Sequence, residues 1–398
     1  MKKLLSIILS AALLTSCVQT PDNVKSSQPD SSQSSQTESL HTESSQPVSK
    51  QMRKTTTETD FESCTADSRN IILAGSYDNI KLDSNFKVVA SAYPSSYQAA
   101  VSSDYDKNAD YIFGLFLPDK TQGYYEDKKQ LHTDENTGVR SYEYTNGTST
   151  GFVSSDGIVA IVENEYMNKA EYGNGIPVNE TRNLIMPVTD DKLSLGTETV
   201  DVRDMQQKSA EKLNSFIASD KESSSVKCTF DYKPYSVSSV TEQSGETLAF
   251  LHCRQTIDNT PVFDIVPLRD SFRNMPAMLG SIITFNAKGN IVQMKKQEDL
   301  DIRSAEKPKE ILTAEYAFET ASKALAPHLS HTARFEELVL VPTIESTDTQ
   351  TIHHDLKPGD AVTLKPYWII HFETDWWTEV YAAVNAVTGE VEYVRNRD

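Results

Sequence analysis

The chain has 398 residues and a formal net charge of −19, with 57 acidic and 38 basic side chains. This balance disfavours nucleic acid as a partner, because phosphate binding needs clustered Lys and Arg, and an anionic membrane surface would repel the acidic body. The length exceeds that of a usual single domain, which predicts about two or three folded units.

Residues 1–17 have the features of a lipoprotein signal peptide. Two lysines precede an apolar run, 4–14, which is shorter than the ~20 residues that a helix needs to span a bilayer. The ending Leu14-Thr15-Ser16-Cys17 resembles the bacterial lipobox. That resemblance implies cleavage before Cys17 and acylation of its thiol, with chains such as palmitate holding the protein on the extracytoplasmic face of the cell membrane.

Residues 18–60 form the predicted tether between the lipid and the folded part. They are dominated by Ser, Gln and Thr, with scattered Pro and almost no large apolar side chains. Such a segment cannot bury enough apolar surface to offset the entropy cost of ordering, so the composition predicts disorder. A random coil of ~43 residues would span roughly 35–40 Å on average.

Residues 61–195 are predicted to form a β-rich domain of unknown type. Alternating apolar and polar residues favour strands, and Ser155-Asp156-Gly157 has the chemistry of a hairpin turn. The expected strands are 86–93, 110–117, 139–145 and 151–163.

The C-terminal half shows one pattern twice, at 196–305 and 306–398. Each copy opens with a predicted amphipathic helix, 201–218 in the first and 314–326 in the second. Asp201 can cap the first helix and Thr313 the second. Strand patterns follow at 226–240, 248–257 with an extension to Phe263, 281–294, 335–344, 366–372 and 380–394. Because a helix stripe can cover one face of an antiparallel sheet, we predict an α+β fold class. It comprises a β-rich N-terminal domain followed by two tandem helix-on-antiparallel-sheet modules.

Both copies end in the same hairpin pattern, at 282–289 and 381–389. In each, apolar residues alternate into a short turn whose glycine can supply a positive φ. The second copy resembles the PepSY module, a small α+β domain of bacterial envelope proteins and protease propeptides. The resemblance rests on 312–317, 366–372 and 384–391.

The first copy resembles this module more weakly, through 251–262. Tandem modules of this general kind also occur in YycH/YycI-type proteins, which restrain a cell-wall-sensing histidine kinase. The resemblance implies a PepSY- or cystatin-like fold with a role in binding, inhibition or signalling outside the membrane. It implies no catalytic residue and no cofactor.

Three cysteines remain beyond the lipidation site: Cys64, Cys228 and Cys253. Export permits disulfides, and Cys228 with Cys253 is the obvious pair. A hairpin folded at the best turn signal, Ser244-Gly245, would instead set Cys253 opposite Tyr235. A Cys228–Cys253 disulfide and buried free thiols therefore both remain open.

No motif in the chain predicts a catalytic or metal site. The match of 147–151 to G-x-S-x-G lacks the strand-to-helix turn that would project Ser149 as a nucleophile. His353-His354-Asp355 lies in a polar stretch, and adjacent side chains diverge rather than converge on a metal, even with His328 and His331 in the same copy.

The aromatic residues of the second copy divide into core and candidate partner-binding positions. Trp368, Ile370 and Phe372 alternate on one strand face, which the helix is expected to cover. Trp376 and Trp377 follow among acidic residues, and two adjacent tryptophans on a strand cannot both face inward. They either close the end of the core or anchor a bound partner.

The lipid anchor, the repeated pattern and the lack of a catalytic constellation favour a non-catalytic binding or regulatory module for a cell-envelope protein or peptide. The expected means is strand addition at an open sheet edge, together with aromatic contacts. A solute-binding lipoprotein of a transporter is one alternative, although such receptors alternate β and α segments around parallel sheets. An envelope hydrolase is another, and it would need a base that converges on Ser149.

Mass spectrometry of the protein extracted from membranes tests the predicted anchor. We expect the mature chain to begin at Cys17 and to carry at least two acyl chains, because a single chain, at ~0.8 kcal/mol per buried CH₂, holds a protein only marginally. Cys17→Ala should abolish both the cleavage and the added mass. A bare N-terminus on membrane-bound protein would contradict the prediction.

Overall fold

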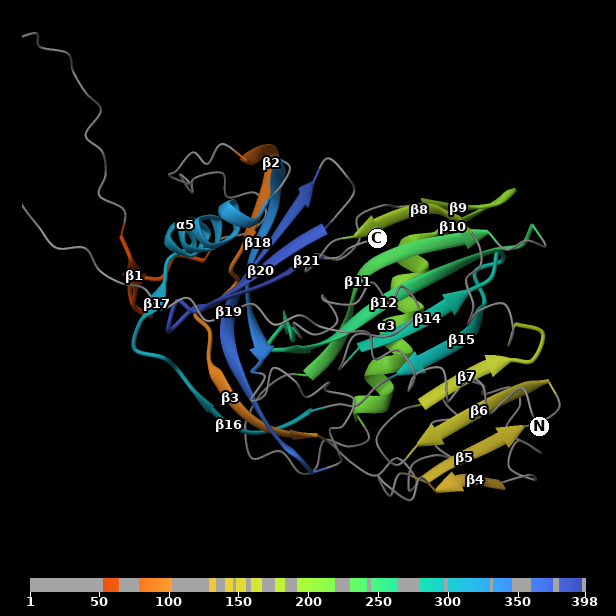
Figure 1. Ribbon diagram of the computed structural model, residues 1–398. Helices are drawn as coiled ribbons and strands as arrows, with labels where there is room; N and C mark the ends of the chain where they lie inside the picture. Colours follow the sequence, from red (N-terminus) through yellow and green to blue (C-terminus); the bar gives the residue numbers. More distant parts are fainter. Residues whose placement is uncertain are drawn as a thin grey trace, which may run out of the picture. The chain divides into compact units, whose positions relative to one another are not determined.

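The computed structural model describes most of the chain beyond the predicted tether (Figure 1). The described residues are 53–63, 79–101, 129–133, 140–145, 148–154, 159–166, 176–182, 192–218, 230–241, 245–263, 280–296, 300–329, 332–345, 359–374 and 379–395. All of them belong to one unit, Gln51–Asp398.

A ten-stranded antiparallel sheet is the larger of the two main sheets in the described chain. Its path runs through β4 (Lys129–Thr133), β5 (Arg140–Thr145), β6 (Ser149–Ser154), β7 (Val159–Glu163), β15 (Ile291–Lys296), β14 (Gly280–Phe285), β12 (Thr247–Ile257), β11 (Phe230–Thr241) and β8 (Ile176–Arg182). The short β13 (Thr260–Pro261) pairs with β12 outside this path.

A seven-stranded sheet forms the other large layer. Its path runs through β16 (Leu300–Glu306), β3 (Ser96–Val101), β19 (Ala361–Thr374), β18 (Ala333–Ile344) and β2 (Ile80–Val89), and it is extended from β19 by β20 (Glu379–Asn385) and then β21 (Val391–Arg395). The pair β18–β2 is parallel. Two short antiparallel pairs join β1 (Thr55–Thr56) to β17 (Ile311–Leu312) and β9 (Lys192–Leu195) to β10 (Glu198–Asp201).

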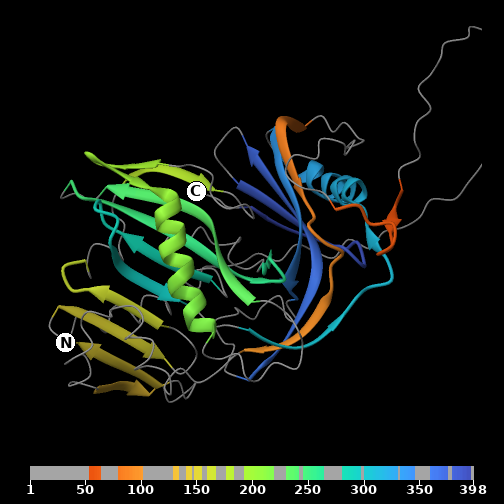
Figure 2. The same ribbon diagram turned by 180° about the vertical axis from the view of Figure 1, so that it is seen from behind.

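One helix, α3 (Val202–Ala218), lies across a face of the ten-stranded sheet, as Figure 2 shows. Asp201 Oδ1 caps it by accepting the N–H of Arg203 at 2.9 Å, as the sequence predicts. Met205 and Leu213 are fully buried and pack onto the sheet in one apolar cluster. The helix is therefore held by the apolar stripe that its sequence spacing indicates.

The second helix, α5 (Ala314–Leu325), covers the seven-stranded sheet and is followed by a short 3₁₀ turn, η4 (Ala326–His328). Thr313 caps α5 by accepting the N–H of Tyr316. The ring of Phe318 lies 4.8 Å from that of Phe335 and 6.3 Å from that of Phe372, measured between centroids. Trp368 is buried in the same cluster, which confirms its expected place in the core.

The predicted fold class is wrong. The described chain is predominantly β, and its strands do not form a separate N-terminal domain followed by α+β tandem helix-on-sheet modules. The strands of 61–195 are instead distributed between the two large sheets, with β2 and β3 in the seven-stranded sheet and β4 to β8 in the ten-stranded sheet. The physical reason is that strands from the C-terminal half leave sheet edges to which strands from elsewhere in the chain can pair.

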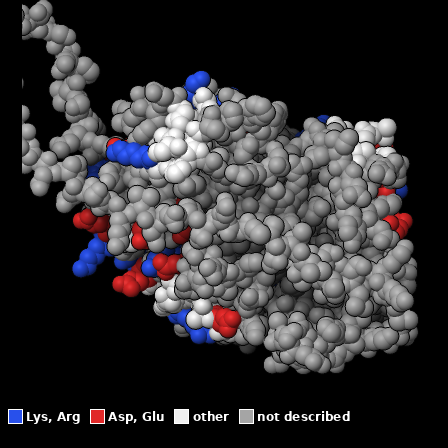
Figure 3. All heavy atoms as spheres, in the orientation of Figure 1, with Lys and Arg blue, Asp and Glu red and all other residues white. Residues whose placement is uncertain are grey.

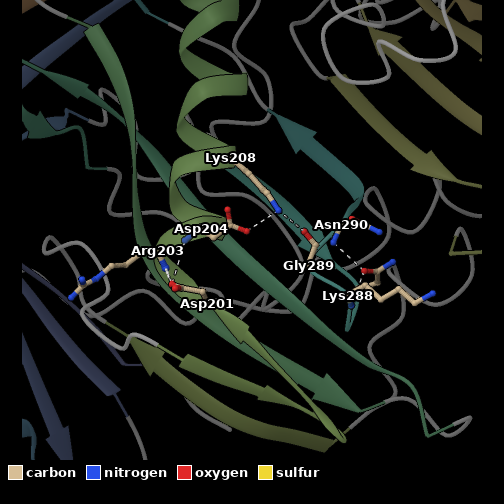
Figure 4. A network of polar contacts seen from close by, with 8 residues as sticks. Asp201, Arg203, Asp204, Lys208, Lys288, Gly289 and Asn290 are labelled. Atoms are coloured by element: carbon tan, nitrogen blue, oxygen red, sulfur yellow. Dashed lines mark hydrogen bonds and ion pairs between the residues drawn. The ribbon is translucent and has the colours of Figure 1, made fainter.

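The two predicted hairpin turns have the same local geometry. Gly289 has a φ of +73° and Gly389 a φ of +81°, which confirms the expected role of both glycines. Figure 4 shows the first turn beside α3, where Lys208 Nζ lies 2.7 Å from Asp204 Oδ2 and donates to Gly289 O at 3.3 Å. The turn between β14 and β15 is thus tied to the first turns of the helix.

Truncation of one aromatic residue tests the packing of α5. Phe318→Ala should lower the free energy of unfolding by about 3–5 kcal/mol, because it opens a cavity among buried rings. Lys323→Ala, on the exposed side of the same helix, should change it by no more than about 0.5 kcal/mol. Urea denaturation followed by tryptophan fluorescence measures both, and similar effects of the two substitutions would contradict this packing.

Candidate functional site

The edges of the two large sheets differ in regularity. Within the described ranges the strands that end the paths of these sheets are β4, β8, β16, β2 and β21, and the two-residue β13 pairs only with β12. The first four each pair with their neighbour through a register that is interrupted by a shift. By contrast, β21 pairs with β20 at five consecutive positions without a shift. Irregular register blunts an edge against the addition of another strand, so β21 is the regular edge, which we name the open edge.

The backbone of β21 offers hydrogen-bonding groups on its outer side. Asn385 N–H donates to Glu390 O at 2.8 Å. This bond shows which residue pairs of β20 and β21 are hydrogen-bonded to each other and which are not. Because the residues of an antiparallel edge strand direct their backbone groups alternately inward and outward, those of Val391, Tyr393 and Arg395 are directed away from β20. An added strand would pair with these groups.

A buried side chain holds the turn from which β21 begins. Asn385 Oδ1 accepts the N–H groups of Val387 at 2.9 Å and of Thr388 at 3.0 Å. Gly389 follows at positive φ and donates its N–H to Asn385 O at 2.8 Å. The start of the open edge is therefore positioned by a compact set of hydrogen bonds.

Carboxylates lie close to this turn. Burial raises the pKa of the Tyr367 hydroxyl, a hydrogen bond with Asn385 opposes that shift, and the charges of Glu392, Glu345 and Glu390 raise the pKa further. The main cause is that burial disfavours the charged phenolate, and the three neighbouring negative charges repel it as well. One of these carboxylates, Glu345, is itself paired with Lys365 at 3.0 Å.

A row of ionisable side chains crosses three strands of the same sheet. Glu337, His371 and Tyr381 occupy paired positions on β18, β19 and β20, and all three are buried. The rings of His371 and Tyr381 stack with centroids 4.7 Å apart, and His371 Nδ1 lies 3.5 Å from Glu336 Oε2. The burial and stacking of these side chains indicate that the row specifies the packing of the three strands.

Residues 53–61 form a strap at the N-terminal end of α5 (Figure 1). In the strap, β1 pairs with β17 in antiparallel register. The hydroxyl of Thr313, the cap of α5, donates to Arg53 O at 2.7 Å. The rings of Phe61 and Tyr93 meet edge to face, with centroids 5.5 Å apart. Residues 53–60, which composition assigns to the disordered tether, therefore belong to the folded unit.

Exposed ion pairs surround the strap. Lys307 pairs with Glu58, and Arg53 pairs with Asp60 at 2.9 Å. On the face drawn in Figure 3, basic and acidic side chains are interspersed in this area rather than gathered by sign. Exposed pairs of this kind contribute little stability. The strap is thus held mainly by its short backbone pairing and a few side-chain contacts.

Leu312 connects the strap to the open edge. Its N–H donates to Ala386 O at 2.7 Å, in the turn between β20 and β21, and its O accepts Trp368 Nε1–H at 2.9 Å. Its Cδ1 lies 3.5 Å from the position that a Cβ on Gly389 would take. Leu312 of β17 therefore contacts the turn. The same strand, β17, also pairs with β1 of the strap.

Most of the predicted site residues lie outside the described residues: Cys17, Cys64, Cys228, His331, 353–355, Trp376 and Trp377. Their proposed roles stay predictions. In the chain, Trp376 and Trp377 fall between β19 and β20, next to the strand that pairs with the open edge. Ser149 is buried at the start of β6, opposite Glu163 on β7, and not at a strand-to-helix turn.

Cys253 is a buried free thiol. It pairs with Pro234 rather than with the predicted Tyr235, because a register shift between Pro234 and Ser236 leaves Tyr235 out of the ladder. Burial raises the pKa of the Cys253 thiol far above its usual range.

Two further findings concern the described ranges only. No three His, Cys, Asp or Glu side chains are grouped there in a way that could hold a metal ion. None of the helices in this part of the chain has both the length and the apolar character that crossing a bilayer requires.

Comparison with known proteins gives a fold and no activity. No family model matches the chain, and no curated protein matches it. Among solved structures, an uncharacterized protein from Eubacterium rectale ATCC 33656 is similar, with a TM-score of 0.52 at 13% sequence identity. The match covers 79% of this chain and 91% of that chain. A likeness at this identity concerns the arrangement of strands and helices alone.

Sequence reasoning missed the strap and the special status of β21. The signal for the strap is the β-branched run Thr55-Thr56-Thr57, followed by Phe61, inside a stretch otherwise rich in Ser and Gln. The regularity of β21 has no local signal, because it depends on which strand lies beside β20.

Alkylation with iodoacetamide tests the state of Cys253. In the native protein we expect no labelling at neutral pH, since burial excludes the reagent and the raised pKa keeps the thiol protonated. In denaturant without reductant, Cys253 should be fully labelled, as peptide mass spectrometry would show. Labelling that appears only after reduction would mean that Cys253 is disulfide-bonded.

Proposed function

We propose that this chain is a lipid-anchored protein of the extracytoplasmic face of the cell membrane that binds an extended segment of a cell-envelope protein or peptide. The role is binding or regulation without catalysis, and the segment pairs with β21. The observation that carries the proposal is the register of β21, which alone among the strands that end the paths of the two large described sheets has no shift.

Strand addition suits this edge for a physical reason. Backbone hydrogen bonds to an added strand supply affinity whatever the partner's sequence, and side-chain contacts supply specificity. A single added strand is marginal without such contacts. In this proposal Trp376 and Trp377, which fall between β19 and β20 in the chain, provide the aromatic contacts to the partner.

Two sequence features support the same role. The lipobox-like ending at Cys17 would hold the protein where envelope proteins are accessible. The PepSY-like residues 312–317, 366–372 and 384–391 resemble those of modules that act by binding or inhibition. They include the start of β21 and the turn before it.

Site-specific photo-crosslinking in intact cells tests the proposal. A benzophenone amino acid at Glu390, which is exposed at the start of the open edge, should form an adduct with one discrete envelope protein or peptide. The same probe at Glu211, which is exposed on α3, is the positional control and should not form that adduct.

Two substitutions at one position separate backbone pairing from side-chain contact. Tyr393→Pro removes an outward N–H and spares the inward ladder, as proline on an edge strand can, and should reduce the Glu390 adduct about tenfold. Tyr393→Ala retains that N–H and should preserve most of the adduct. An undiminished adduct in Tyr393→Pro, or the same adduct from Glu211, would exclude strand addition at β21.

A further inference from the structure

The strap is where the tether enters the folded unit. Residues 18–52 connect Cys17 to Arg53, the first residue of the strap. With the proposed lipid on Cys17, any pull that the membrane exerts through the tether acts on β1 before it reaches the rest of the fold.

The strap is held less firmly than the residues on which it docks. Its strand β1 is two residues long, Thr55 and Thr56, and both are only half-buried. Ile311 and Leu312, their partners on β17, are 1% and 4% exposed. Short, partly exposed pairings are the first parts of a protein to open by local unfolding.

The residues that receive the strap also hold the turn of the open edge. Leu312 N–H donates to Ala386 O, and the Leu312 side chain packs where Gly389 has no Cβ. Thr313, the next residue, donates its N–H to Lys54 O at 3.2 Å and its hydroxyl to Arg53 O. Because of these direct contacts, a change in the mobility of β17 affects both the strap and the turn.

We propose that the strap is a latch that regulates the open edge. Docked on β17, it limits the motion of that strand and so stabilises the turn from which β21 begins. Peeled away, it lets the turn and the first residues of β21 open more often, which weakens the binding of a partner there. The effect on partner binding rests on the proposed function of β21, whereas the coupling between strap and turn does not.

Hydrogen exchange measured by mass spectrometry on the full chain tests the coupling without any partner. Thr55→Pro combined with Thr56→Pro breaks the pairing of β1, and exchange of the amides in 385–391 should accelerate roughly tenfold or more. Ser45→Pro, the same chemical change upstream of the strap, should have no effect. The equivalent turn, 286–291, is the internal reference and should keep its rate.

The reciprocal variant tests the same coupling from the other side, because coupling between two sites is equal in both directions. Gly389→Ala strains the turn at its positive φ of +81° and adds a Cβ 3.5 Å from Leu312 Cδ1. It should speed exchange of the strap amides, 53–56. Gly289→Ala, at a φ of +73° in the reference turn, is the matched control and should not.

The outcomes separate this inference from the proposed function. Unchanged exchange at 385–391 in the double proline variant, or equal acceleration at 286–291, would overturn the latch even if crosslinking finds a partner on β21. Acceleration confined to 385–391, with strap amides that respond to Gly389→Ala and not to Gly289→Ala, would establish the latch. That result would stand even if Glu390 gives no adduct.

Discussion

The arrangement around the open edge depends on the backbone of a single buried residue, Leu312. Its N–H and C=O bond to Ala386 O and to Trp368 Nε1, so two groups that would be costly to bury unpaired are satisfied by the turn and by the core of β19. Since Thr313 follows directly as the cap of α5, the start of the helix, the strap and the turn are fixed together. A shift of this one segment would disturb all three.

The edges of the sheets show how the fold limits unwanted pairing. A row of unpaired backbone groups invites another strand, and proteins blunt such rows with bulges, short strands and charges. The register shifts at β4, β8, β16 and β2 follow this rule, and β21 departs from it. An edge that stays regular while four others are interrupted is either a site for a partner or a liability.

Local features could be predicted from the sequence, and long-range partners could not. The caps Asp201 and Thr313 and the positive φ at Gly389 follow from chemistry within a few residues, and the structure confirms them. Sheet membership of β2 and β7 is decided by β18 and β15, which lie far away in the chain, so no local pattern carries it. The same limit displaced the expected partner of Cys253 by one residue, because a bulge at Tyr235 depends on both strands. Strand addition at an open sheet edge stays a prediction from the sequence, and the identity of the regular edge strand, β21, comes only from the long-range pairing of the sheet.

Loss of the strap need not unfold the turn. The contacts therefore allow the strap to regulate how often the turn opens without changing its average structure. When β1 leaves, Leu312 still has its bonds to Ala386 and Trp368, so the average position of the turn is retained. What changes is the free energy needed to open it, since β17 has lost the neighbour that limited its motion. Regulation by the strap is therefore a change in opening frequency rather than a change in shape. Two static structures of the docked and peeled states would look alike at β21 and would differ in how readily that strand exchanges and binds.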